Sequence, residues 1–180
     1  MHISQKLKKE NIAEYLLYMW QVEDLIRTNN FDIDKLENNY ISQFKIDDSQ
    51  KAELKEWYEN IIEMMRSEGV KEKGHIQINN NIIILLNDLH LQLLKSPKFP
   101  YYSAAYYKAL PVIVELRRKA GENEKGELET CFEALYGLMM LRLQGKNVSE
   151  ETLKAMTAIS QFIGMLSDYY KKDKAEPLEF

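Results

Sequence analysis

The sequence predicts an all-α fold, arranged as a single-domain bundle of about seven helices. Its 180 residues include only 7 glycines and 4 prolines, and this scarcity of turn formers favours long helices over many short strands. Apolar residues also recur at helical spacing along most of the chain. A chain of this length can bury a core without disulfides or metals, so we expect one domain over residues 1–180, with a short tail at 173–180.

The most sharply patterned stretch is residues 11–27, which reads NIAEYLLYMWQVEDLIR. We expect a first helix that begins as early as Ser4, ends near Thr28 and carries one broad apolar face. Glu23 lies within this face. A carboxylate that points into a core must be paired, hydrogen-bonded or protonated, because an isolated buried charge is very unfavourable. Glu23 is therefore the first candidate site residue.

Two shorter-range signals predict the next helices. Asp32 is a suitable N-cap for a short second helix, since its side chain can accept hydrogen bonds from free backbone N–H groups. Asp47 and Gln50 have the spacing of a capping box, which predicts a third helix that runs to about Glu68. Two glycines bracket a charged run at 69–74, and this pattern indicates a loop.

The second half of the chain predicts four more helices. Residues 76–95 are apolar over a wide arc, and we expect this fourth helix to be the most central one. The fifth begins at Pro100 and carries an internal proline, Pro111, which predicts a kink or a split. A sixth helix covers 128–143, and a seventh follows Ser149 as its N-cap.

Charge and cysteine content exclude several classes of protein. The single cysteine, Cys131, cannot form an intramolecular disulfide, and we interpret it as a small core residue. The N-terminus lacks the apolar core of a signal peptide, and no apolar run approaches the ~20 residues that cross a bilayer. A net charge of −4 gives no overall attraction to nucleic acid, although Lys6, Lys8 and Lys9 form a slight basic patch. We expect a cytoplasmic protein without membrane or nucleic-acid partners.

Searches for catalytic and metal-binding motifs give mostly negative results. Glu72 and His75 have the Glu-x-x-His spacing of carboxylate-bundle metal sites, but Gly74 places the pair in a loop and no second copy exists. With three histidines in the chain, a zinc site is not expected. An acidic run is interpreted as a solvated charge run: Glu122, Glu124, Glu127 and Glu129. The sequence predicts no metal and no cofactor.

Three polar residues on inward faces form the candidate pocket: Glu23, His90 and Arg142. One interpretation is a buried ion pair between Glu23 and Arg142, completed by tyrosine hydroxyl groups, with no reaction. The other is a pocket in which Arg142 holds a ligand anion and Glu23 or His90 moves a proton.

The tyrosines suggest a second kind of site. The chain has 11 tyrosines, and several gather where the fifth helix begins. Tyr102 and Tyr106 lie on the expected inner face of this helix, whereas Tyr101 and Tyr107 lie outside it. Since tyrosine supplies a large contact area at a small entropic cost, Tyr101 and Tyr107 are the candidate contact surface.

The stretch from Glu10 to Arg27, ENIAEYLLYMWQVEDLIR, resembles the N-terminal helix of a bacterial family of short proteins described only as a domain of unknown function. The resemblance implies an all-helical fold over the chain. It implies no reaction, cofactor or catalytic residue.

Apolar and aromatic surface is plentiful while every familiar catalytic signature is absent. We therefore expect a protein–protein interaction module that associates with itself or with another protein, and not an enzyme. The alternative is a small-molecule-binding protein, or an enzyme of unrecognised type, that uses Glu23, His90 and Arg142.

Overall fold

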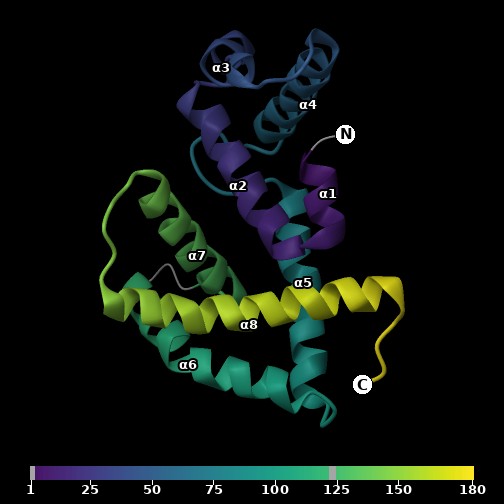
Figure 1. The fold of residues 1–180 in the computed structure, drawn as a ribbon, viewed down its shortest axis with the longest axis vertical. Helices are drawn as coiled ribbons and strands as arrows, with labels where there is room; N and C mark the ends of the chain where they lie inside the picture. Colours follow the sequence, from purple (N-terminus) through teal and green to yellow (C-terminus); the bar gives the residue numbers. More distant parts are fainter. Residues whose placement is uncertain (1–2, 122–124) are drawn as a thin grey trace. The chain divides into compact units, whose positions relative to one another are not determined.

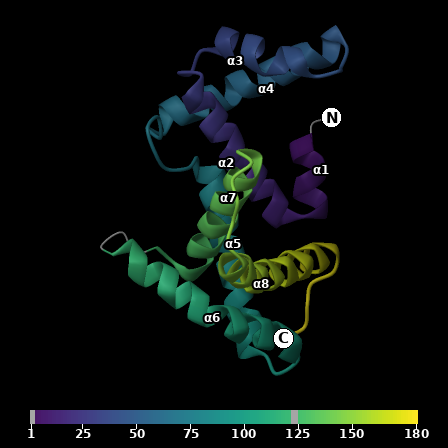
Figure 2. The same ribbon diagram turned by 60° about the vertical axis from the view of Figure 1, so that its left-hand side comes forward.

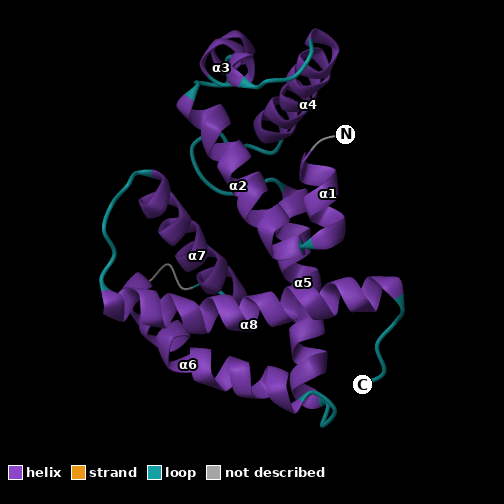
Figure 3. Ribbon diagram, viewed as in Figure 1, coloured by secondary structure: helices purple, strands orange, loops and turns teal. Residues whose placement is uncertain are grey.

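The computed structural model describes residues 3–121 and 125–180. Over these residues the chain forms eight α-helices and one 3-10 helix, and no strand (Figure 3). The all-α prediction is thus confirmed, with one helix more than expected. The chain divides into two compact units. Unit 1 comprises the described residues up to Lys6 together with Tyr18–Asn81, and unit 2 comprises Leu7–Leu17 and Ile82–Phe180. The prediction of a single domain stays a prediction.

The additional helix arises because the expected first helix is interrupted at Asn11. It consists of α1 (Ile3–Glu10) and α2 (Ile12–Thr28). The Asn11 side-chain oxygen accepts a hydrogen bond from the backbone N–H of Glu14 at 3.2 Å. The same oxygen accepts a second bond from the Ser167 hydroxyl at 2.8 Å, and this hydroxyl also accepts from the backbone N–H of Ala13. Asn11 therefore acts as an N-cap that begins a new helix and ties it to the rest of unit 2.

Unit 1 contains the sequence-predicted caps. After α2 come α3 (Ile33–Asn39), the 3-10 helix η1 (Ile41–Gln43) and α4 (Asp48–Ser67). Asp32 caps α3, and Asp47 and Gln50 form a reciprocal capping box at the start of α4. α3 packs against η1 and α4. The buried side chains of this part are Leu36, Ile41, Tyr58, Ile61, Ile62 and Met65.

Unit 2 is built mainly from α6 (Pro100–Ala120), α7 (Glu127–Leu143) and α8 (Glu150–Ala175). α8 packs along α6, and α7 packs against both of them (Figures 1 and 2). α5 (Gln77–Lys95) begins in unit 1 and continues into unit 2. Glu122 and Glu124 of the acidic run lie outside the described residues. Ser149 caps α8 as expected, since its hydroxyl accepts from the backbone N–H of Thr152.

Two sequence predictions about helices need correction. α6 is one continuous helix through Pro111, where the sequence predicted a kink or a split. Pro111 lies on the exposed side of α6, so the carbonyl that loses its N–H partner there can bond to water instead. α5 is also less buried than its wide apolar arc suggested, because Ile78 and Leu85 are 44% and 47% exposed.

Candidate functional site

Glu23 is fully buried in unit 1, and three groups of the same unit bind its carboxylate. The backbone N–H of Ile76 donates to one oxygen at 2.9 Å. The other oxygen lies 3.0 Å from Nδ1 of His75 and 3.3 Å from the side-chain nitrogen of Asn79. Donors to both oxygens are what a buried carboxylate requires. The face of α2 that carries Glu23 thus meets the start of α5.

His75 is a residue that the sequence interpretation dismissed. Its ring stacks on the indole of Trp20, with centroids 4.1 Å apart and planes 8° from parallel. The Glu-x-x-His spacing of Glu72 and His75 did not indicate the role of His75. The useful signal was Glu23, because a buried carboxylate on α2 requires a hydrogen-bond donor. Because Nδ1–H of His75 faces Glu23, a neutral ring keeps its lone pair on Nε2. No hydroxyl or thiol group of the described residues forms a hydrogen bond with this ring.

Arg27 forms a second connection between α2 and the loop that precedes α5. Its guanidinium donates to the carbonyl oxygens of Val70 and Gly74, in the loop between α4 and α5. It also forms an ion pair with Asp24 at 3.1 Å. Together with Glu23 and His75, Arg27 holds both ends of this loop against α2. The geometry supports a structural role for the cluster.

His90 occupies a different cluster, in the core of unit 2. Its Nδ1 lies 2.6 Å from the hydroxyl oxygen of Tyr102, and its ring contacts those of Tyr106 and Phe162 at 4.8 and 5.4 Å. Burial lowers the pKa of His90, which keeps the ring neutral at physiological pH. Tyr106 in turn donates to a carboxylate oxygen of Glu127. His90 is therefore a buried core histidine whose Nδ1 has a hydrogen-bond partner.

Arg142 does not lie on an inner face, contrary to the sequence prediction. It is exposed near the C-terminal end of α7, although it lies on the same side of the helix as Cys131. The buried residues of α7 all lie in its first half, between Leu128 and Phe132. It lines a groove of about 380 Å³ in unit 2, whose walls come from α2, α7 and α8. Glu14 and Gln161 also line this groove, and His90 does not. Within the described residues, the guanidinium group of Arg142 has no ion-pair or hydrogen-bond partner.

The three candidate pocket residues thus have separate surroundings. Every described partner of Glu23 belongs to unit 1, whereas His90 and Arg142 belong to unit 2 and contact different residues there. A shared pocket for the three residues stays a prediction. The candidate contact residues Tyr101 and Tyr107 are 82% and 62% exposed on α6, as expected from their position on the helix.

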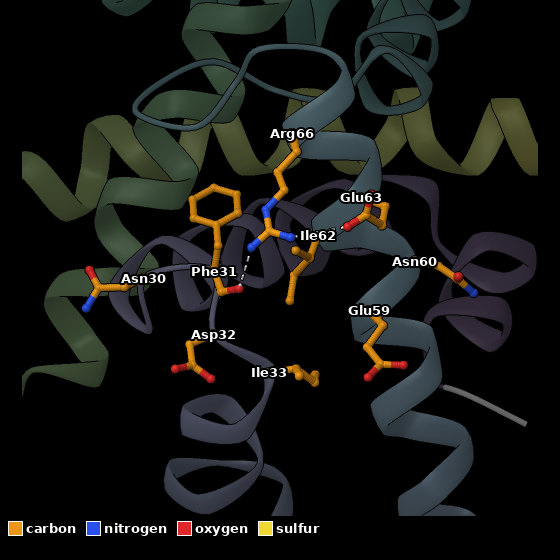
Figure 4. Close-up of a pocket in the computed structure, with 9 residues that line it drawn as sticks. All are labelled: Asn30, Phe31, Asp32, Ile33, Glu59, Asn60, Ile62, Glu63 and Arg66. Carbon is orange, nitrogen blue, oxygen red and sulfur yellow. Dashed lines mark hydrogen bonds and ion pairs between the residues drawn. The ribbon is translucent and has the colours of Figure 1, made fainter.

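Figure 4 shows a further pocket of unit 1, between the α2–α3 connection and α4, with a volume of about 780 Å³. At one end Arg66 donates to the carbonyl oxygen of Phe31 and pairs with Glu63, both at 3.2 Å. Phe31 adopts a left-handed backbone conformation with φ of 60°, which is unfavourable for a bulky residue. The contact from Arg66 helps to hold this turn. The carboxylates of Asp32 and Glu59 line the same pocket, and Asp32 is already engaged as the cap of α3.

The described residues contain no group of three or more histidine, cysteine, aspartate or glutamate side chains that could hold a metal ion. None of the described helices combines the length and the apolar character needed to cross a bilayer.

The raised pKa values of three tyrosines in unit 1 predict that the protein loses stability in alkaline solution. Burial raises the pKa of Tyr18 to about 12, and it also raises the pKa values of Tyr40 and Tyr58. An unfolded chain releases these protons near pH ~10, so the folded state binds more protons than the unfolded state above that pH. We expect the contribution of these tyrosines to the free energy of unfolding to be constant up to about pH 10 and to fall as the pH rises toward the native pKa. Urea unfolding at several pH values measures this slope.

The matched variant for this experiment is Tyr18→Phe, which removes one titrating hydroxyl and keeps the ring. Its slope above pH ~10 should be shallower than that of the wild type. An identical slope would show that Tyr18 does not contribute to the alkaline loss.

Comparison with known proteins assigns the chain to a family. No curated protein and no solved structure matches it. The family described as domain of unknown function (DUF4924) matches residues 1–177, which include every described helix. This match agrees with the resemblance of the N-terminal helix. The chain belongs to the DUF4924 family, for which no activity is described.

Proposed function

We propose that this protein is a cytoplasmic interaction module that self-associates through the exposed face of α6. The observation that carries the proposal is a stripe of apolar residues along this face, which we call the α6 stripe: Ala104, Tyr107, Pro111 and Val114. Tyr107 and Val114 are 62% and 55% exposed. The opposite face of α6 packs on α7 and α8, so the stripe is the free side of the helix. The cytoplasmic assignment rests on the single buried Cys131, which suits a reducing compartment.

The spacing of the α6 stripe suits a second helix. Its residues stand at i, i+3, i+7 and i+10, which is the a/d spacing that places side chains in one seam between two packed helices. Ala104 and Pro111 are compact, so a second helix can approach closely beside the larger Tyr107. Tyr101, one turn earlier and also exposed, extends the contact at its edge.

The charges that flank the stripe favour a second copy in antiparallel orientation. Lys108 and Glu115 both lie on the same side of the stripe, seven residues apart, and both are exposed. In an antiparallel helix pair the equivalent sides of the two stripes face each other. Lys108 of each copy then lies near Glu115 of the other, whereas a parallel pair would lose both attractions. A face that is complementary to itself is what a two-fold symmetric dimer requires.

The size of the surface predicts a weak association. One helix face of this length buries less than about 1,200 Å² in total, which is the range of transient complexes. We therefore expect a dimer that forms at micromolar concentration and dissociates on dilution.

A charge-swap experiment tests the proposal. Lys108→Glu and Glu115→Lys each place like charges opposite each other, and each should weaken the dimer about tenfold. The double variant restores opposite charges, so its dissociation constant should return toward that of the wild type. Sedimentation equilibrium over a range of concentrations measures the three constants. Lys154→Glu, on α8, makes the same charge change outside the stripe and should leave the dimer unchanged.

Two results would overturn the proposal. A wild-type protein that stays monomeric up to high micromolar concentration has no α6 dimer. A dimer that tolerates both single swaps must use another surface.

A further inference from the structure

Three aromatic side chains, together with aliphatic and polar ones, line a small pocket in unit 1. It has a volume of about 210 Å³ and lies beside η1, between α2 and α4. Tyr18 of α2 forms one wall, and Tyr40 and Phe44, which flank η1, form the others. Ile46 and Leu54 complete the apolar lining. We call this site the aromatic pocket.

The rings that line the aromatic pocket lie in different planes. The rings of Tyr40 and Phe44 are 5.0 Å apart and perpendicular, at 90°. Tyr58, which is buried behind the pocket, holds the ring of Tyr40 in an edge-on contact at 6.2 Å. Trp57 supports the ring of Tyr18, with centroids 6.4 Å apart. These contacts fix the walls in place before any ligand arrives, while Phe44 remains 39% exposed at the mouth.

The charge at the aromatic pocket is negative. Glu53 of α4 is exposed at its rim and takes part in no ion pair within the described residues. None of the residues described as lining the pocket is cationic. The lysines on either side of Glu53 in α4 are engaged elsewhere: Lys51 donates to the carbonyl oxygen of Ser42, and Lys55 pairs with Glu37 at 2.6 Å. Glu53 is therefore free to attract a cation.

We propose that the aromatic pocket binds a methylated ammonium group. Such a group carries a positive charge on a surface of methyl groups, and it is attracted to the faces of aromatic rings without needing hydrogen-bond acceptors. Tyr18, Tyr40 and Phe44 supply these faces, and the Glu53 carboxylate supplies a longer-range attraction. An anion would be repelled by Glu53.

The volume of the pocket also suits this ligand. Sites for drug-sized molecules occupy roughly 300–1,000 Å³, and the aromatic pocket is smaller than that range. It has room for a compact head group such as trimethylammonium, while the rest of the ligand remains at the open mouth beside Ile3 and Phe44. The recognised feature is therefore the head group, whether a free small molecule or a trimethylated lysine side chain carries it.

A comparison of two ligands of the same shape tests this assignment. Choline carries the trimethylammonium group, and dimethylbutanol has the same shape with a neutral carbon in place of nitrogen. Both can be titrated into the full chain while the backbone amide signals of Phe44 and Glu53 are followed by two-dimensional NMR spectroscopy. We expect choline to shift these signals in a saturable way and to bind about tenfold more tightly than dimethylbutanol. Equal binding of the two ligands would mean that the pocket recognises only apolar shape, and no binding of choline at millimolar concentration would overturn the proposal.

Substitutions at the rim locate the binding. Phe44→Leu keeps an apolar side chain but removes one aromatic face, and it should weaken choline binding about tenfold. Glu53→Gln keeps the shape and removes the charge, so it should weaken choline binding and leave dimethylbutanol unaffected. Glu56→Gln makes the same change at an exposed position of α4 outside the pocket lining and should have no effect. Because Phe44 and Glu53 are both exposed, these variants should fold normally. Choline binding that survives both substitutions would place the ligand elsewhere and overturn the proposal.

The source of the head group is determined with a third ligand, trimethyl-lysine with blocked ends. Tighter binding of this compound than of choline would assign the pocket to a methylated protein side chain. Tighter binding of choline would assign it to a free small molecule.

Discussion

Replacing Glu23 by alanine is expected to lower the free energy of unfolding by about 3 kcal/mol. The substitution removes the acceptor of the backbone N–H of Ile76 and of the side-chain nitrogen of Asn79, both of which are buried. Neither donor has another partner in the part of the chain that the structure describes. A buried donor without a partner is destabilising by about 1–3 kcal/mol, and the missing side chain also leaves a cavity. Equilibrium urea unfolding, followed by circular dichroism, measures the loss.

The control for Glu23 lies on the same helix. Glu14 is an exposed glutamate of α2, and Glu14→Ala should change the free energy of unfolding by less than about 0.5 kcal/mol. Glu23→Gln keeps the shape and one acceptor oxygen, so we expect a loss between those of the two alanine variants. If Glu23→Ala were as stable as Glu14→Ala, the hydrogen bonds at Glu23 would contribute no net stability to unit 1.

Replacing Phe162 by alanine is expected to lower the free energy of unfolding by about 4 kcal/mol. Its ring is fully buried in unit 2 and contacts the rings of His90, Tyr102 and Tyr106, with centroids 5.3 to 5.7 Å apart. Truncation leaves a cavity among three rings that are themselves fixed by hydrogen bonds, so the neighbours cannot collapse into it. Denaturant unfolding, with signals from both units recorded, measures this effect.

The adjacent residue provides the matched control for Phe162. Gln161 is exposed on α8, and Gln161→Ala should have little effect on unfolding. Phe162→Leu fills much of the volume and should lose clearly less stability than Phe162→Ala. A loss below about 1 kcal/mol for Phe162→Ala would contradict the view that this aromatic cluster forms the core of unit 2.

The features that depend on neighbouring residues could be predicted from the sequence. Asp32, the pair Asp47 and Gln50, and Ser149 were recognised as helix caps, and each makes the expected hydrogen bond in the structure. These bonds join groups within three residues of one another, so the local sequence contains both partners. The all-α class follows from the same kind of local pattern, repeated along the chain.

Helical periodicity also showed which side of a helix a residue occupies, within limits. It correctly predicted that Glu23 and Cys131 are buried and that Tyr101 and Tyr107 are exposed. It failed for Arg142 at the end of α7, where the apolar residues spread around the helix and no single face is marked. A pattern that surrounds the helix cannot identify the side that the rest of the protein covers.

The residues that each helix face contacts became known only from the packing of the helices. Glu23 needed a donor, but the donors are His75 and Ile76, more than fifty residues away, and no sequence spacing links them to it. The break at Asn11 likewise has a partner at Ser167, at the other end of the chain. Local sequence fixes backbone conformation through short-range hydrogen bonds. The pairing of distant side chains depends on how the helices pack, which is set by the summed burial of many residues and not by any one motif.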